Sequence, residues 1–68
     1  MTLTLKATNP TTIQNMERFI STTSLFPAHI INETQLKVYG LPVRSLVHLL
    51  TRLNQMGIDF TIDAITND

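Results

Sequence analysis

Acidic and histidine side chains are the first residues in the sequence that could carry out chemistry. Asp59 and Asp63 lie four positions apart in a stretch whose alternation predicts one face of a strand. Their carboxyl groups would be roughly 13 Å apart, further than the acid and base pairs of glycosidases. His29 and His48 have no cysteine or paired carboxylate at the spacing of a metal site. These residues predict neither a catalytic pair nor a metal centre.

A row of basic side chains is the second candidate. Arg44, His48 and Arg52 are spaced four apart in a stretch whose periodicity predicts a helix, so they lie one above another on its surface. Such a row can contact phosphate groups or an acidic partner. The alternative, and the commoner arrangement, is the solvent-exposed side of an amphipathic helix.

Serine and threonine are plentiful, but the sequence has no glycine-rich phosphate loop, nucleophile elbow or Ser/His/Asp order to accompany them. Five basic and five acidic residues give a formal net charge of zero, which is not the electrostatic signature of a general nucleic-acid binder. The sequence therefore predicts a protein that is not an enzyme and that needs no cofactor.

Length and composition narrow the class further. The 68 residues suffice for one domain, 1–68, which would bury only about 60% of the surface of its unfolded chain. Without cysteine, the remaining common support for so small a core is association with a partner or with a second copy. No run approaches the ~20 apolar residues of a membrane span, and MTLTLKATNP lacks the features of a secretory leader. We expect a soluble, cytoplasmic protein.

Residues 42–63, PVRSLVHLLTRLNQMGIDFTID, predict the helix and strand that place most of these side chains. Pro42 suits the first helical turn and Gly57 the left-handed residue that follows the last turn. Ile58, Phe60, Ile62 and Ala64 then alternate with polar residues, as in a strand with one buried face. The expected buried stripe of the helix has spacings of three and four and consists of Val43, Leu46, Val47, Leu50 and Leu53.

The N-terminal half predicts a strand, a helix and a hairpin. Residues 2–8 alternate, with Leu3, Leu5 and Ala7 on the buried face. A helix follows to about Thr22, begun either by Asn9 before Pro10 or by a capping box from Thr11 to Gln14; its expected buried residues are Ile13, Met16, Phe19 and Ile20. Strands over 28–32 and 35–39 are expected to be joined at Glu33 and Thr34, with Leu36 and Val38 facing the core.

The resulting order is strand, helix, strand, strand, helix, strand. Two right-handed crossovers joined by a hairpin predict a ferredoxin-like α+β domain, with four antiparallel strands and both helices on one face of the sheet. In the usual order of this architecture the fourth strand lies beside the first, followed by the third and the second.

The other face of such a sheet is uncovered, and the alternation assigns its residues. Ile31 and Tyr39 are expected side by side as its apolar anchors for a partner, although a solvated face with cross-strand ion pairs is the alternative. The predicted partner-binding residues on this open face are Lys6, His29, Ile31, Lys37, Tyr39, Asp59 and Asp63.

Residues 36–42, LKVYGLP, resemble a strand signature of RNA-recognition motifs, in which a strand with an exposed aromatic leads through a short turn into a helix. The resemblance covers that strand and turn, and Lys37 stands where the family stacks a base. The element order is also similar to that of small ligand-sensing domains of the ACT type, which carry glycine where Asn9 and Pro10 stand here.

Two hypotheses follow. The first is a non-enzymatic interaction module, a regulator, adaptor or inhibitor, whose partner is another protein or a second copy bound through the open face or the edge strand AHIIN, residues 28–32. The alternative is a single-stranded RNA-binding domain that uses Tyr39, Lys37, Lys6 and the row of Arg44 and Arg52.

Overall fold

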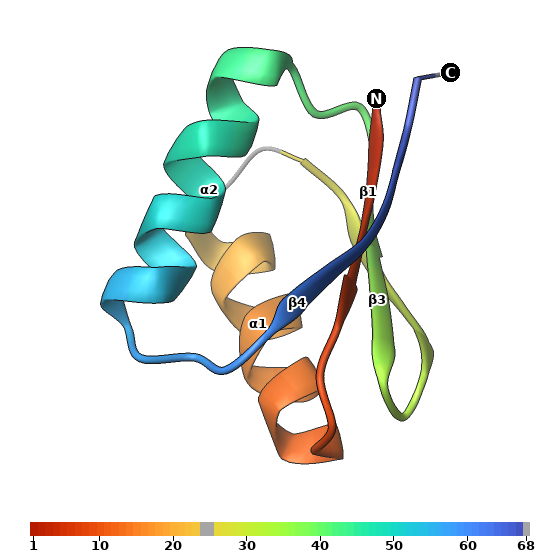
Figure 1. Ribbon diagram of the computed structural model, residues 1–68, viewed down its shortest axis with the longest axis vertical. Coiled ribbons are helices and arrows are strands. Elements are labelled where there is room, and N and C mark those ends of the chain that lie inside the picture. Colours follow the sequence, from red (N-terminus) through yellow and green to blue (C-terminus); the bar gives the residue numbers. More distant parts are fainter. Residues whose placement is uncertain (24–25, 68) are drawn as a thin grey trace.

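The computed structural model describes residues 1–23 and 26–67 of the chain. The strands form one antiparallel sheet in the order β2-β3-β1-β4, and both helices lie on the same side of it (Figure 1). The predicted ferredoxin-like α+β architecture is confirmed. In chain order the elements are β1 Thr2–Lys6, α1 Pro10–Thr23, β2 Ala28–Asn32, β3 Gln35–Val38, α2 Val43–Gln55 and β4 Thr61–Thr66.

The first helix, α1, begins at a cap formed by Asn9. The backbone N–H of Thr11 donates to Asn9 Oδ1 at 2.8 Å, so Pro10 takes the first helical position, where its missing N–H leaves no bond unmade. Of the two caps that the sequence allows, the structure uses the asparagine. The fully buried side chains of this helix are Ile13, Met16 and Ile20.

The second helix, α2, has a capping motif at its C-terminal end and no side-chain cap at its start. Pro42 occupies the cap position at its start without a side-chain hydrogen bond. At its end, Gly57 has a φ of +73°; its N–H donates to the carbonyl of Asn54, and that of Ile58 donates to the carbonyl of Leu53. These two bonds form a Schellman motif, which satisfies carbonyls that the last turn leaves without partners.

The hairpin between β2 and β3 turns at Glu33 and Thr34, as predicted. No Asn-Gly pair is needed, because Asn32 Oδ1 accepts hydrogen bonds from both the backbone N–H and the hydroxyl of Thr34. This side chain therefore shapes the turn as an Asx turn does.

The core lies between the two central strands and the helices. Of the strand residues predicted to face it, Leu3, Leu5, Ala7, Leu36 and Val38 are confirmed as buried, whereas those of the last strand are not; Phe19 on α1 is only partly buried. The buried apolar residues are Leu3, Leu5, Ala7, Ile13, Met16, Ile20, Leu36, Val38, Leu41, Leu49 and Leu53.

The predicted buried stripe of α2 is partly wrong. Val43 and Val47 are 68% and 62% exposed, whereas Leu49, which the stripe left out, is buried together with Leu53. Apolar residues cover about half the circumference of this helix, and the sheet and α1 cover only part of that arc. The helix was therefore predicted correctly, but it is rotated so that Leu49 and Leu53, rather than Val43 and Val47, face the core.

The predicted start and facing of the last strand are also wrong. Residues 58–60 cross from the end of α2 back to the sheet, and β4 begins only at Thr61. Its register shifts at Asp63, an extra residue between two paired positions. Such a bulge reverses the facing of the residues that follow it, so Ile65, paired with Leu3, takes the helix-facing position expected for Ala64.

Candidate functional site

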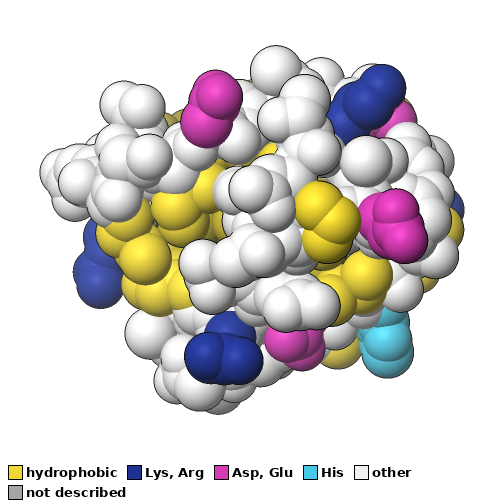
Figure 2. Space-filling view, turned by 90° about the horizontal axis from the view of Figure 1, so that it is seen from below, with side chains coloured by type: hydrophobic (Ala, Val, Ile, Leu, Met, Phe, Trp, Pro, Cys, Tyr) yellow, Lys and Arg dark blue, Asp and Glu magenta, His cyan; other side chains and the backbone are white. Residues whose placement is uncertain are grey.

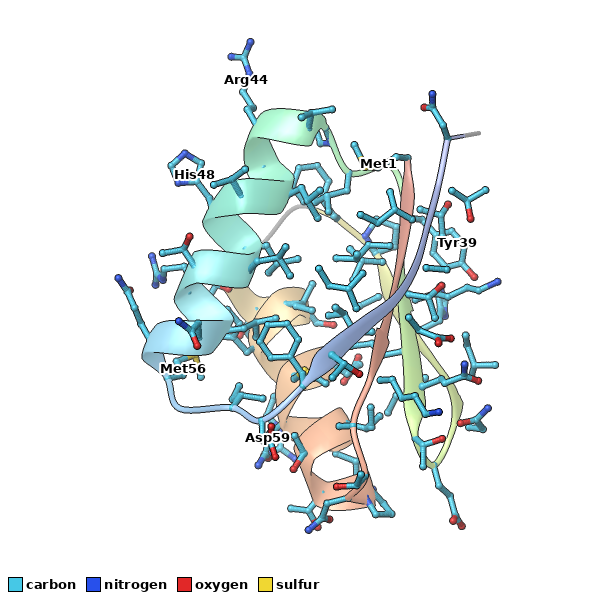
Figure 3. The ribbon with its side chains drawn as sticks, viewed as in Figure 1. Met1, Tyr39, Arg44, His48, Met56 and Asp59 are labelled. Carbon is cyan, nitrogen blue, oxygen red and sulfur yellow. The ribbon has the colours of Figure 1, made fainter. Side chains whose placement is uncertain are left out.

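The open face of the sheet holds most of the polar side chains that the alternation assigned to it. Lys37 lies opposite Thr4 on β1 and opposite His29 on β2, and directly paired residues share a face. Lys6, two residues beyond Thr4, lies on the same face. Tyr39 follows β3 on the side away from the helices (Figure 3).

Contacts among its own side chains hold this face together. Gln35 Nε2 donates to Asp63 Oδ2 at 2.7 Å, a bond that reaches across β1. The rings of His29 and Tyr39 meet edge to face, with their centroids 5.6 Å apart. These two contacts fix four of the side chains on this face.

One predicted open-face residue, Asp59, lies elsewhere, and another, Ile31, interrupts the pairing of its strand. Asp59 precedes β4 and lies on the helix side of the sheet (Figure 3), because the chain is still crossing from α2 at that point. Ile31 is the extra residue of a bulge in β2. It does not adjoin Tyr39 as expected, since the ring beside Tyr39 belongs to His29.

The basic row on α2 is divided by its surroundings. The guanidinium carbon of Arg52 lies 5.8 Å from the centroid of the Phe19 ring on α1, so Arg52 packs between the two helices. Arg44 and His48 project from α2 away from the sheet (Figure 3), and His48 also lines, with Arg52 and Phe19, a pocket beside the two helices. The structure therefore does not present the three side chains to one ligand as an equivalent set.

A surface that the sequence analysis missed lies between α2 and β4. Its most exposed apolar residues are Val43 and Val47, with Ile62 and Ile65 at 46% and 50% exposure. Every residue of β4 is exposed, including the two isoleucines on the helix-facing side. We call this surface the α2–β4 face and define it by Val43, Val47, Leu50, Phe60, Ile62 and Ile65.

An open groove of about 450 Å³ runs along this face. Leu50, Ile58, Phe60 and Ile62 supply its apolar lining, and Thr51, Asn54 and Asp59 its polar lining. Val47 lies three and four residues from Leu50 and Thr51, so it stands on the same flank of α2 as the groove. Seen from below, hydrophobic side chains gather in a hollow on the side of the molecule where α2 lies (Figure 2).

One signal in the sequence could have indicated this surface. Leu46, Leu49 and Leu53 form one apolar row on α2, while Val43 and Val47 belong to another. Two rows on one helix exceed what a single contact with a sheet covers.

The part of the chain that the structure describes holds no group of three or more His, Cys, Asp or Glu residues arranged to bind a metal ion. It also contains no helix with the length and apolar character needed to cross a membrane.

Comparison with known proteins adds no relative. No family model matches the chain, and the searches of curated proteins and of solved structures give no significant match. No known relative therefore bears on the function.

Proposed function

We propose that the protein is a small, non-enzymatic interaction module, which acts by binding protein as a regulator, adaptor or inhibitor. The observation that carries this proposal is the exposure of Val43 and Val47, at 68% and 62%, beside a groove lined by apolar side chains. Contiguous apolar patches on small soluble domains mark interaction sites. Binding would remove these side chains from water, which is the dominant favourable contribution in most protein association.

The open face supports this role less well than the α2–β4 face does. Two of its polar side chains, Gln35 and Asp63, bond to each other, and its exposed aromatic, Tyr39, is only 37% exposed. Interfaces draw most of their binding energy from a few residues that become fully desolvated, and Val43 and Val47 have larger exposed fractions than Tyr39. We therefore assign the binding surface to α2 and β4, rather than to the open face.

Capture of partners from the native host tests the proposal. Tagged wild-type protein should retain a partner that the double variant Val43→Glu/Val47→Glu loses, because two carboxylates would have to be buried at the contact. Tyr39→Glu is the matched control on the open face and should retain the partner. Recovery of the same proteins by all three, or of no specific protein by the wild type, would contradict the proposal.

One observation favours RNA binding as a second candidate function. His29 and Tyr39 place two rings beside Lys37 on the open face, and rings with a nearby cation are what single-stranded nucleic acid stacks upon. Fluorescence anisotropy with a labelled single-stranded RNA at low salt should then show binding that Tyr39→Ala abolishes. No binding at low salt would dispose of this candidate.

A further inference from the structure

We infer that the α2–β4 face binds a second copy of this chain, so that the protein forms a two-fold symmetric dimer. The inference rests on the proposed function as an interaction module and names the partner of that same surface. It is carried by the shape of the face, the positions of its charges and its size.

The face is complementary to itself in shape. Val43 and Val47 are its most exposed apolar side chains and form a ridge on α2, while Leu50, Phe60 and Ile62 lie lower and line the groove beside it. A two-fold axis that lies in the plane of the interface, perpendicular to α2, sets the ridge of each copy into the groove of the other. The same contact is then made twice, as in the isologous interfaces of most dimers.

Side chains, rather than the backbone edge of β4, carry this contact. The bulge at Asp63 interrupts the regular spacing of backbone groups along the strand, and bulged edges are poor templates for strand pairing. The carboxylate of Asp63 itself accepts a hydrogen bond from Gln35 on the other face of the sheet. It therefore adds no charge to the proposed interface.

The charges at the two ends of the face are complementary under the same symmetry. The helix α2 and the strand β4 run in opposite directions, with the start of α2 at one end and Asp59 at the other (Figures 1 and 3). A two-fold axis perpendicular to α2 exchanges these ends, so Asp59 of one copy meets the start of α2 of the other, where Arg44 adjoins Val43. A carboxylate is favoured there by both the arginine and the positive end of the helix dipole.

The size of the face suits a stable dimer. A standard interface takes about 800 Å² from each partner, which is less than a fifth of the 4393 Å² that the chain exposes. The helix of 13 residues and the strand of six residues are each roughly 20 Å long. An interface of that size would therefore have to engage the flank of this helix, the groove and the strand together, and a formal net charge of zero leaves no overall repulsion between copies.

Sedimentation equilibrium of the purified full chain, from low micromolar to hundreds of micromolar, tests the inference. The wild type should dimerise, and Val43→Glu/Val47→Glu should raise the dissociation constant at least tenfold while keeping the circular dichroism spectrum. The control Ile30→Glu, on the opposite edge, should dimerise as the wild type does. A monomeric wild type, or a double variant that dimerises as tightly, would overturn the inference.

Charge reversal then tests the symmetry itself. Asp59→Arg and Arg44→Asp should each weaken the dimer severalfold, and the variant with both changes should restore it, because it exchanges the charges of the pair. Failure of the double reversal to restore association would overturn the two-fold arrangement. If the wild type is monomeric but still captures a host protein that Val43→Glu/Val47→Glu loses, the dimer is refuted and the proposed function stands.

Discussion

The two helices cover the same side of one sheet, but they use their apolar residues differently. In α1, Ile13, Met16 and Ile20 are each at most 1% exposed. In α2, Leu53 is fully buried and Leu49 is 8% exposed, while Val43 and Val47 remain more exposed than any other large hydrophobic residue that the structure describes.

The difference shows that amphipathicity and burial are separate properties of a helix. The first helix has about as much apolar surface as the sheet beneath it can cover. The second has a surplus, and the adjoining strand β4 is exposed along its whole length. Surplus apolar surface beside an exposed strand indicates a contact with another molecule. The helix α1 has no such surplus, so it does not suggest a second interface.

The largest effect on stability is expected for a buried residue of α2, compared with an exposed residue of the same helix. Replacing the fully buried Leu53 by alanine leaves a cavity and should lower the free energy of unfolding by about 2–5 kcal/mol. Val47→Ala on the exposed flank should change it by no more than about 0.5 kcal/mol. Urea denaturation at a concentration where the chain is monomeric measures both, and equal losses would show that Val47 is buried in solution.

The Schellman motif that ends α2 should give the next largest effect on stability. Gly57 adopts a left-handed conformation with open space around the position of a Cβ atom, so Gly57→Ala costs only backbone strain, about 1–2 kcal/mol. Gly57→Asn should lose less, because asparagine tolerates this conformation better. The measurement is the shift of the denaturation midpoint, and an unchanged midpoint for alanine would mean that the Schellman turn does not hold α2 in place.

The N-terminal cap of α1 should have a somewhat smaller effect on stability than the C-terminal motif of α2. Asn9→Ala removes the acceptor for the Thr11 N–H and should cost about 1 kcal/mol. The matched variant Asn9→Asp keeps an acceptor and should unfold at nearly the wild-type urea concentration. If alanine and aspartate behave alike, the capping box from Thr11 to Gln14 closes the helix instead.

The contact between the helices should give the smallest change. Arg52→Ala removes the cation from the Phe19 ring and should lower stability by about 0.5 kcal/mol, the usual value for an exposed pair. Arg44→Ala, whose side chain points away from the protein, is the control and should have no effect on the monomer (Figure 3). Thermal unfolding at low concentration distinguishes the two, and equal losses would indicate a general effect of charge.

The sequence alone determined the order of the elements and their architecture. The alternation of residues 2–8, the proline and glycine at the ends of α2 and the hairpin at Glu33 and Thr34 are local signals, each of which depends on a few neighbouring residues. The sequence predicted the candidate surface less accurately than the fold. Of the seven residues predicted for the open face, the structure removes Asp59 and places Ile31 in a bulge.

Which apolar residues stay exposed depends on tertiary packing. Periodicity shows that an apolar arc exists on α2, but the rotation of the helix follows from how it packs on the sheet and on α1, contacts made by residues distant in sequence. The bulge at Asp63 likewise depends on pairing with β1, nearly sixty residues earlier in the chain. A surface defined by what the core leaves uncovered cannot be read from local pattern, because coverage is a property of the packed whole.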